Sequence, residues 1–402
     1  MGLVNVDGVR AAAALLDGVV RQTPLEGSRV LGARLGGPVY LKCENLQRTG
    51  SFKIRGAYVR IARLSDDERA RGVVAASAGN HAQGVALAAE LLGASATVFM
   101  PVGAPLPKVA ATRNYGATVE LVGSTVDEAL VAATKYAAEQ GSVFVHPFEH
   151  PDVIAGQGTV GLEILEQCPD VRTVIVGAGG GGLVSGVAVA VKGLRPDVRV
   201  VAVQAESAAA FPGSLAAGHP VRLPSYSTMA DGIAVGCPGE LTLEHVSTLV
   251  DDVVTVSEEA LSRGLLLCVE RAKLVVEAAG AAAVAALLEE PRRFAAPVVA
   301  VLSGGNIDPV LLLRVLQHGM IAAGRYLSLR LRIPDRPGEL ARLLGLLADQ
   351  GANVLDVEHH RTGPRLHLGE VEVALSVETR GAGHCDALMS ALRGAGHTLV
   401  FS

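Results

Sequence analysis

The sequence has no tryptophan, only 7 phenylalanines and 6 tyrosines, and no basic cluster in a chain whose formal net charge is −5. Proteins that bind nucleic acids use positively charged surfaces and stacked aromatic rings, so this composition argues against a nucleic-acid partner. The 5 cysteines are scattered and form no C-x-x-C pair. That pattern predicts neither a disulfide framework nor a thiolate metal site, and we expect no bound metal.

Long hydrophobic segments are also missing, because no apolar run reaches the roughly 18 residues that a membrane span needs. The Ala- and Val-rich start of the chain is interrupted by Asp7, Arg10 and Asp17, and it lacks the basic and apolar regions of a signal peptide. We therefore expect a helix over residues 1–17, no contact with a membrane, and a cytoplasmic protein.

Half of the 402 residues are hydrophobic and 19% are charged, which indicates a globular chain of several domains. Short β-branched runs alternate with helical stretches up to about residue 323, which predicts an α/β fold of parallel-type sheets flanked by helices. The alternation is dense enough over 46–145 to predict a small domain inserted into a large one, formed by 1–45 and 146–323. The predicted strands are 38–43, 72–76, 96–100, 118–122, 173–176, 199–204 and 298–302.

The pattern changes after Gly324, where polar and apolar side chains alternate over residues 326–333. A helical stretch, two strands, a second helix and a last strand follow, at 337–350, 353–361, 370–378, 385–393 and 398–401. This βαββαβ order predicts an α+β module of ferredoxin-like fold over residues 326–402.

Lys53 lies between the strand predicted at 38–43 and a helix predicted over 58–64. Either Thr49 or Ser51 is suited to cap that helix. The positive end of a helix dipole disfavours a charged lysine, so a lysine in the first turn is a candidate amine nucleophile or base. The alternative for a lone lysine is an ordinary solvated side chain.

Three further segments of polar residues or glycines follow predicted strands. The backbone N–H groups of Ser77–His81 are suited to bind a carboxylate, although a helix cap at Asn80 and a surface histidine at His81 are the plainer interpretation. Gly177–Leu183 is suited to a phosphate, because glycines let the backbone approach it closely. Ser303 follows the strand predicted at 298–302, either as a helix cap or as a hydroxyl donor to a ring nitrogen.

The glycine segment leaves a second interpretation open. Gly177, Gly179 and Gly182 match G-x-G-x-x-G. Glu206 follows at a suitable distance for a ribose, as in nicotinamide oxidoreductases. That function gives no role to the lysine or to the serine–asparagine loop. An amine, a carboxylate site, a phosphate site and a hydroxyl donor together favour pyridoxal phosphate with an amino-acid substrate.

The chain resembles the threonine dehydratases (threonine ammonia-lyases) from about Thr23 to its C-terminus. They belong to the pyridoxal-phosphate family of fold type II, with serine racemases, serine dehydratases and tryptophan synthase β chains. The tail resembles a single ACT domain, a regulatory module. The motifs that carry the resemblance are, in family order, Ser51-Phe52-Lys53, Ser77-Ala78-Gly79-Asn80-His81, Gly179-Gly180-Gly181-Gly182-Leu183 and Ser303-Gly304-Gly305-Asn306, with Asp335-Arg336-Pro337-Gly338-Glu339-Leu340 in the tail.

The resemblance implies a two-domain fold of type II, a C-terminal ACT domain and pyridoxal 5'-phosphate as cofactor. It implies that Lys53 is the catalytic residue, which holds the cofactor as a Schiff base and, once free, takes the α-proton of the substrate. The other implied cofactor contacts are Phe52 beside the ring, Asn80 at its 3-hydroxyl, Ser303 at its nitrogen, and Gly179, Gly180, Gly181, Gly182 and Leu183 at its phosphate. The implied carboxylate site of the substrate is Ser77, Ala78, Gly79, Asn80 and His81.

The implied reaction converts L-threonine to 2-oxobutanoate and ammonia, the first step toward isoleucine, with L-serine to pyruvate as a side activity. A serine dehydratase or a broader hydroxy-amino-acid ammonia-lyase is the alternative, and a non-catalytic amino-acid sensor is a third class. Serine racemases carry a serine where this chain has Ala78, which argues against racemisation. Gln204 stands where some relatives bind a divalent metal through an acidic residue, and a monovalent cation is left open.

The ACT resemblance implies inhibition by isoleucine, opposed by valine, in a homodimer or homotetramer. The best-known biosynthetic relatives carry two such domains in tandem, so a module that only supports dimerisation is the alternative. The implied effector residues are Pro337, Gly338, Glu339, Leu340 and Asn353.

Overall fold

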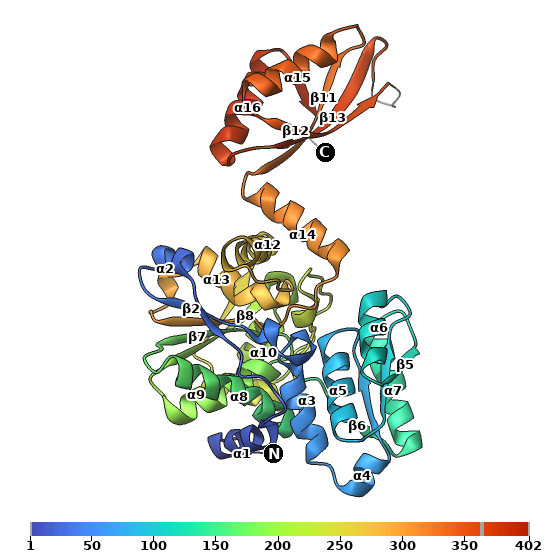
Figure 1. The fold of residues 1–402 in the computed structure, drawn as a ribbon, viewed down its shortest axis with the longest axis vertical. Coiled ribbons are helices and arrows are strands. Elements are labelled where there is room, and N and C mark those ends of the chain that lie inside the picture. The colour runs from blue at the N-terminus through green and yellow to red at the C-terminus, as the bar shows by residue number, and fades with distance from the viewer. Residues whose placement is uncertain (1, 362–365, 401–402) are drawn as a thin grey trace. The chain divides into compact units, whose positions relative to one another are not determined.

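A computed structural model describes residues 2–361 and 366–400 and divides into two compact units, with the boundary along the chain between Leu312 and Leu313. The first unit contains two mainly parallel sheets with helices around them, and the second contains an antiparallel sheet with two helices (Figure 1). The predicted fold class is therefore confirmed. All 5 cysteines are free.

The large sheet has six strands in the order β1-β2-β10-β7-β8-β9. Every neighbouring pair is parallel except β1 and β2. Four of its strands were predicted, whereas β1 and β9 were not. Strand β1 has only three residues, which are too few to show alternation. The strands are β1 (Leu25–Gly27), β2 (Val39–Lys42), β7 (Thr173–Gly177), β8 (Arg199–Ala205), β9 (Asp252–Val256) and β10 (Val298–Val301).

Helices cover both faces of this sheet, as parallel strands require. One face packs Val174, Val200 and Val299 against α8 and α9, and α12 and α13 lie on the other side (Figure 1). The helix predicted at the start of the chain is present as α1, and the side chain of Asn5 caps it. The helices around this sheet are α1 (Val6–Leu16), α2 (Arg29–Leu35), α8 (Pro151–Gln167), α9 (Gly182–Leu194), α10 (Ala210–Ala217), α11 (Glu240–Leu249), α12 (Glu258–Leu267) and α13 (Ala282–Glu289), and α14 (Pro309–Ala322) crosses the boundary of the units.

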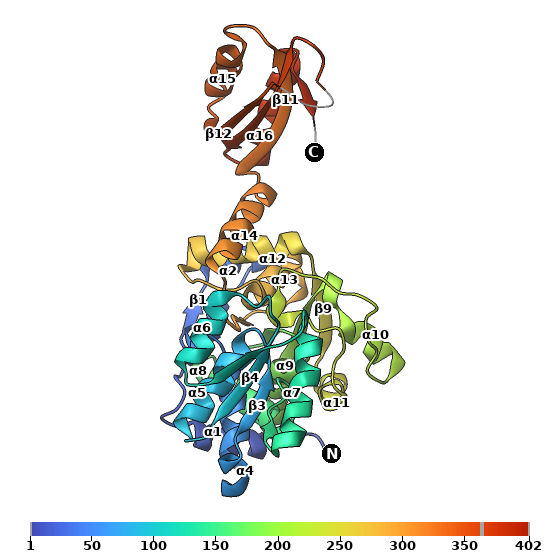
Figure 2. The ribbon, with the colours of Figure 1, turned by 90° about the vertical axis from the view of Figure 1, so that its right-hand side faces the viewer.

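The small sheet is parallel throughout, in the order β5-β4-β3-β6. Val74 and Phe99 pack with α7, whereas Val73 and Val98 pack with α3 and α5. Figure 2 shows α5 and α7 on either side of β3 and β4. Its two-residue strand β6 was not predicted. The elements are α3 (Lys53–Ala62), α4 (Asp66–Ala70), β3 (Val73–Ala76), α5 (Asn80–Leu91), β4 (Ala96–Met100), α6 (Leu106–Asn114), β5 (Thr118–Leu121), α7 (Val126–Gln140) and β6 (Val143–Phe144).

The second unit has the predicted βαββαβ order. Its antiparallel sheet, β12-β13-β11-β14, packs Leu331, Val373 and Leu375 against Leu343 and Leu388 of the two helices. The last predicted strand reached Phe401, which lies outside the described residues. The elements are β11 (Tyr326–Pro334), α15 (Glu339–Asp349), β12 (Asn353–His360), β13 (Glu370–Glu378), α16 (Ala382–Gly394) and β14 (Thr398–Val400).

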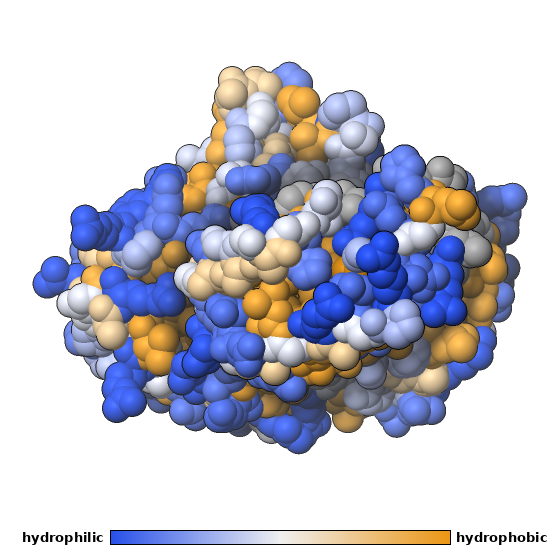
Figure 3. Space-filling view, turned by 90° about the horizontal axis from the view of Figure 1, so that it is seen from above, coloured by the Kyte–Doolittle hydropathy of each residue, from blue (hydrophilic) through white to orange (hydrophobic). Residues whose placement is uncertain are grey.

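The described helices include none that is both long and apolar enough to cross a membrane. On the face shown in Figure 3, hydrophobic residues lie in small patches among hydrophilic ones. The candidate site residues of the first unit follow strands β2, β3, β7 and β10. In parallel sheets the loops at these carboxyl ends form the ligand site.

Candidate active site

Lys53 is the first residue of α3, and its amine is held inside the protein. The Nζ atom donates a hydrogen bond to the carbonyl oxygen of Pro147 at 2.9 Å and lies 5.1 Å from the centre of the Phe52 ring. Burial lowers the pKa of Lys53 to about 8, and the carboxylate of Glu277 opposes part of this effect. The side chain is therefore not an ordinary solvated lysine, and a substantial fraction of the amine is neutral just above physiological pH.

The predicted caps of α3 are wrong. Its N-cap residue is Phe52, whose side chain makes no capping bond. Thr49 lies in the short 3-10 turn Arg48–Gly50 with a φ of 62°, and Ser51 is extended and pairs with Gly304. Among the described residues, the buried hydroxyl of Ser51 has no hydrogen-bond partner. The backbone thus enters the helix from an extended residue that is bound to the end of β10.

The loop Ser77–His81 connects β3 to α5. Ser77 Oγ accepts a hydrogen bond from the N–H of Gly79, the N-cap residue, at 3.1 Å. Asn80 is not the cap: its Nδ2 donates to Glu277 at 2.6 Å, and its Oδ1 accepts from Asn306 at 2.9 Å. Both ends of this amide are therefore fixed.

His81 is buried and is not a surface histidine. Its Nε2 donates to the carbonyl oxygen of Val145 at 2.8 Å. Burial first, and then the charge of Lys53, lowers the pKa of His81 to about 3. The imidazole is therefore neutral over the physiological range.

The glycine segment leaves β7 at Gly177 and enters α9 at Gly182. Gly181 has a φ of 94°, which favours glycine, and a Cβ atom there would lie 2.6 Å from Cζ of Phe211. A Cβ on Gly180 would overlap the ring of Phe148. The side chain of Gln204, in β8, donates to the carbonyl oxygen of Ala178 at 3.2 Å. These contacts leave room only for glycine backbone in front of the first turn of α9.

Ser303, two residues after β10, is buried, and its carbonyl oxygen accepts a hydrogen bond from the N–H of Phe52 at 3.2 Å. Asn306 follows, and its Nδ2 reaches both Asn80 and the carbonyl oxygen of Thr49. The loop after β10 therefore joins the lysine segment to the serine–asparagine loop. The structure brings these three predicted segments into direct contact.

Glu277 was not predicted, and it lies at the centre of these contacts. Its N–H donates to the carbonyl oxygen of Gly304 at 3.1 Å, and a Cβ on Gly304 would collide with its carboxylate. Burial, followed by the negative charge of Asp231, raises the pKa of Glu277 to about 7. The sequence signal was available: Glu277 is an acidic residue in the otherwise apolar run 274–288.

The segment His146–Glu149 also borders the site, and the sequence did not predict it. Pro147 accepts the bond from the lysine, and Phe148 packs on the glycine segment. Glu149 holds this segment in place, because its carboxylate accepts from the N–H of Leu241 at 2.6 Å at the start of α11. Nothing in the local sequence marks these residues, since Pro147 contributes a backbone carbonyl oxygen, and the side chains of Phe148 and Glu149 contact segments that are distant in sequence.

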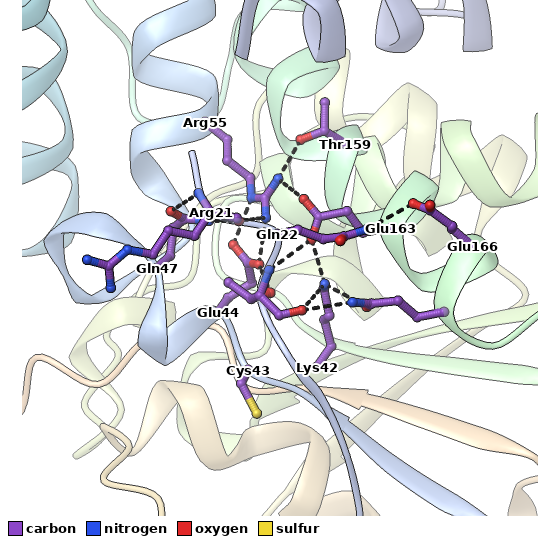
Figure 4. A network of polar contacts seen from close by, with 12 residues as sticks. Arg21, Gln22, Lys42, Cys43, Glu44, Gln47, Arg55, Thr159, Glu163 and Glu166 are labelled. Atoms are coloured by element: carbon purple, nitrogen blue, oxygen red, sulfur yellow. Dashed lines mark hydrogen bonds and ion pairs between the residues drawn. The ribbon is translucent and has the colours of Figure 1, made fainter. Parts of the chain in front are cut away.

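A buried charged cluster fixes the start of α3 (Figure 4). Arg55, two residues after Lys53, donates to both carboxylate oxygens of Glu44 at 2.8 Å and to Glu163 of α8 at 2.6 Å. Lys42 of β2 also binds Glu163, at 2.5 Å. Two positive and two negative side chains thus connect the lysine helix to the large sheet and to α8.

The predicted effector residues lie in the second unit. Gly338, with a φ of 91°, is the N-cap residue of α15, and Pro337, Glu339 and Leu340 surround it. Asn353 starts β12, which follows the other end of this 11-residue helix, and such a helix is about 16 Å long. Within one module, the structure therefore does not bring Asn353 to the other four.

Residues 16–304 match the family model described as pyridoxal-phosphate dependent enzyme, and residues 327–392 match that of the ACT domain. An L-threonine ammonia-lyase of Thermotoga maritima is 48% identical, over 98% of both chains. The processed form of threonine deaminase isoform 2 from Solanum lycopersicum superposes with a TM-score of 0.75 at 38% identity, over 79% of this chain and 87% of that one. Maize serine racemase gives the same TM-score at 37% identity, over 78% of this chain and 97% of that one.

Proposed function

The chain belongs to the family of pyridoxal-phosphate-dependent enzymes, and we propose that it is a threonine ammonia-lyase. It converts L-threonine to 2-oxobutanoate and ammonia, and L-serine to pyruvate as a side activity. The observation that carries this proposal is a buried amine with a lowered pKa, where the segments that follow β2, β3 and β10 meet. The nicotinamide alternative leaves this amine without a role, and the family match decides against it.

The residues present fit the cofactor. An amine whose pKa is about 8 is suited to bind an aldehyde covalently, and Lys53 is such an amine. The glycines before α9 bring bare backbone to a helix N-terminus, which suits a phosphate. Asn80 uses one N–H of its amide on Glu277 and keeps the other for the 3-hydroxyl of the cofactor. We assign the ring nitrogen to Ser303, the ring face to Phe52, and the phosphate to Gly179, Gly180, Gly181, Gly182 and Leu183.

When bound, pyridoxal phosphate supplies an electron-withdrawing ring that stabilises negative charge on the α-carbon of the substrate. Lys53, once its amine is free, takes the α-proton, and its lowered pKa keeps a neutral amine available near pH 8. The loop Ser77–His81 holds the carboxylate of the substrate. The β-hydroxyl leaves as water, and hydrolysis of the remaining enamine gives the 2-oxoacid and ammonia.

Elimination is favoured over racemisation, although a serine racemase has a similar fold. Racemisation needs an acid on the face opposite the lysine. The neighbour of Ser77 in the loop is Ala78, which has no proton to give. His81 is held neutral by burial, and its Nε2 hydrogen is bonded to a carbonyl oxygen.

We extend the proposal to the organisation and regulation of the chain. The small domain is residues 46–145, the large domain is 1–45 with 146–323, and the ACT domain is 326–402. The ACT match supports control by a small molecule. We expect inhibition by isoleucine, opposed by valine, in a cytoplasmic homodimer or homotetramer. Because Asn353 lies far from Pro337–Leu340 in one module, we expect a complete effector site to use two modules.

The test begins with the visible spectrum of the purified protein. We expect a yellow band that borohydride fixes onto the peptide carrying Lys53, and 2-oxobutanoate when L-threonine is added to the unreduced sample. Lys53→Ala should lose both the band and turnover, whereas Lys135→Ala, at an exposed position of α7, should keep both. Turnover that persists in Lys53→Ala would contradict the proposal, and faster turnover of L-serine than of L-threonine would favour a serine dehydratase.

A further inference from the structure

Lys108 and Asp231 form an ion pair that has no role in the mechanism proposed above. Lys108 belongs to α6, beside the small sheet, and its Nζ donates to Oδ2 of Asp231 at 2.6 Å. Asp231 lies in a 3-10 turn, Asp231–Ile233, which packs against the glycine segment. The two residues are 123 positions apart, so the pair joins the part of the chain around the small sheet to the part around the large one.

The pair borders the candidate carboxylate site. A Cβ atom on Gly79, in the middle of the loop Ser77–His81, would lie 3.8 Å from Nζ of Lys108. On the other side, a Cβ on Gly232 would lie 3.4 Å from Oε1 of Glu277, the atom that binds Asn80. Lys108 is therefore a cation placed directly over the residues that receive the substrate.

The loop itself offers dipoles but no charge. The N–H of Gly79 is already bonded to Ser77, and the imidazole of His81 is neutral and bonded to Val145. A carboxylate bound only by backbone N–H groups would lack a counter-ion. Charge-assisted hydrogen bonds are about twice as strong as neutral ones, so a cation over this loop changes its affinity for an amino acid.

We propose that Lys108 binds the carboxylate of the substrate and that Asp231 occupies Lys108 until the substrate arrives. The inference rests on the proposed function, because it takes the loop Ser77–His81 as the carboxylate site. The side chain of Asp231 is 53% exposed, and ion pairs at such positions are weak. Lysine has a flexible four-carbon stem, so its amine can leave Asp231 for a second carboxylate close by. Binding therefore exchanges one ion pair for another.

This exchange predicts opposite effects at the two positions. Lys108→Met removes the cation, so we expect the dissociation constant of L-alanine and the KM for L-threonine to rise about 10- to 100-fold. L-Alanine has no β-hydroxyl to eliminate and reports binding through the visible band of the holoenzyme. Asp231→Asn frees Lys108, so both constants should fall, about two- to fivefold. Lys108→Arg should recover most of the affinity, and Lys135→Met is the matched control.

L-Alaninamide, which has no carboxylate, isolates the role of Lys108. The wild-type holoenzyme should prefer L-alanine to L-alaninamide, and Lys108→Met should lose most of this preference, with a melting temperature close to that of the wild type. Equal rises in the dissociation constant in Lys108→Met and Asp231→Asn would overturn the proposal in favour of a purely structural ion pair. Failure of the wild type to release 2-oxobutanoate would reject the proposed function separately, because the alanine comparison does not depend on turnover.

Discussion

Replacing Arg55 by methionine should strongly destabilise the first unit, because it removes one of four charges from a closed cluster. The side chains of Arg55 and Glu44 are both 0% exposed, and three hydrogen bonds of 2.6 to 2.8 Å join Arg55 to Glu44 and Glu163. With Lys42 the cluster is neutral, and without Arg55 it carries one net negative charge. The methionine fills much of the volume but satisfies neither carboxylate.

The magnitude follows from the burial of Glu44. Burial alone would raise the pKa of Glu44, but the charge and hydrogen bonds of Arg55 outweigh it and hold the pKa below its ordinary value. Removing one partner of such a buried pair costs about 3–5 kcal/mol. A carboxylate with a lowered pKa stabilises the fold above its ordinary pKa and loses this contribution as the pH falls. In the variant, burial without Arg55 raises the pKa of Glu44 above its ordinary value of 4.5, so the variant loses stability as the pH rises beyond that value and its deficit should be larger at pH 7.5 than at pH 5.

Urea unfolding followed by circular dichroism measures this deficit. With an m-value of about 3 kcal/mol per molar urea, the midpoint should fall by about 1–1.7 M. The double variant Arg55→Met/Glu44→Gln restores neutrality and should be more stable than Arg55→Met alone. The control is Arg195→Met, which removes an equally bidentate but solvent-exposed contact with Asp197 and should change the midpoint far less. A single variant within about 1 kcal/mol of the wild type, or a double variant less stable than either single one, would refute this reasoning.

Two further substitutions test the walls of the site. Gly180→Ala places a methyl group in the ring of Phe148, so we expect a loss of about 1–3 kcal/mol in thermal unfolding and weaker retention of the cofactor band on dialysis. Gly213→Ala, in α10 with open space around its Cβ, should be neutral or slightly stabilising, and an equal effect at both positions would show that the ring contact is unimportant. The raised pKa of Glu277, about 7, means that the folded state holds a proton that the unfolded chain releases above about pH 4.5, so this residue costs stability as the pH rises through that interval. The stability of Glu277→Gln minus that of the wild type should therefore rise by about 3 kcal/mol between pH 4.5 and pH 8. The melting temperatures of both proteins at the two pH values measure this rise, and a pH-independent difference would contradict the raised pKa of Glu277.

The sequence predicted those strands and loops whose signal lies in neighbouring residues. Strands such as β3 and β7 are long enough to show a β-branched run, and a serine or glycine segment directly after them marks the end of the strand. Parallel topology then brings these ends together without further information. This is why Lys53, Ser77–His81 and Ser303 could be assigned to one site from their positions after predicted strands. The contacts of Asn306 with Asn80 and Thr49 agree with that assignment.

What the sequence did not predict depends on contacts between distant segments. Asn80 follows a strand as a cap residue would, and only the position of Glu277, 197 residues away, explains why its amide turns away from the helix. Pro147 contributes a carbonyl oxygen, which every residue has. Thr49 and Ser51 were expected to cap α3, but the bridge from Ser51 to Gly304 holds this segment extended, so the helix starts without a side-chain cap. Tertiary contacts override local propensity in each case.

The buried cluster and the reactive amine share the first turn of α3, and this placement explains why charges are used there. An apolar cluster of the same volume would stabilise the fold at least as well, because desolvation consumes most of the attraction within a buried ion pair. Apolar contacts, however, do not fix the rotation of a helix about its axis. The guanidinium of Arg55 binds Glu44 and Glu163 in fixed directions. Arg55 can therefore make all of these bonds at only one rotation of α3 about its axis and one position of α3 along that axis. Lys53 lies two residues earlier on the same turn, and its reach to Pro147 depends on that rotation. We therefore infer that the cluster contributes orientation rather than net stability, and that restoring neutrality in the double variant recovers the fold more completely than it recovers the position of the amine.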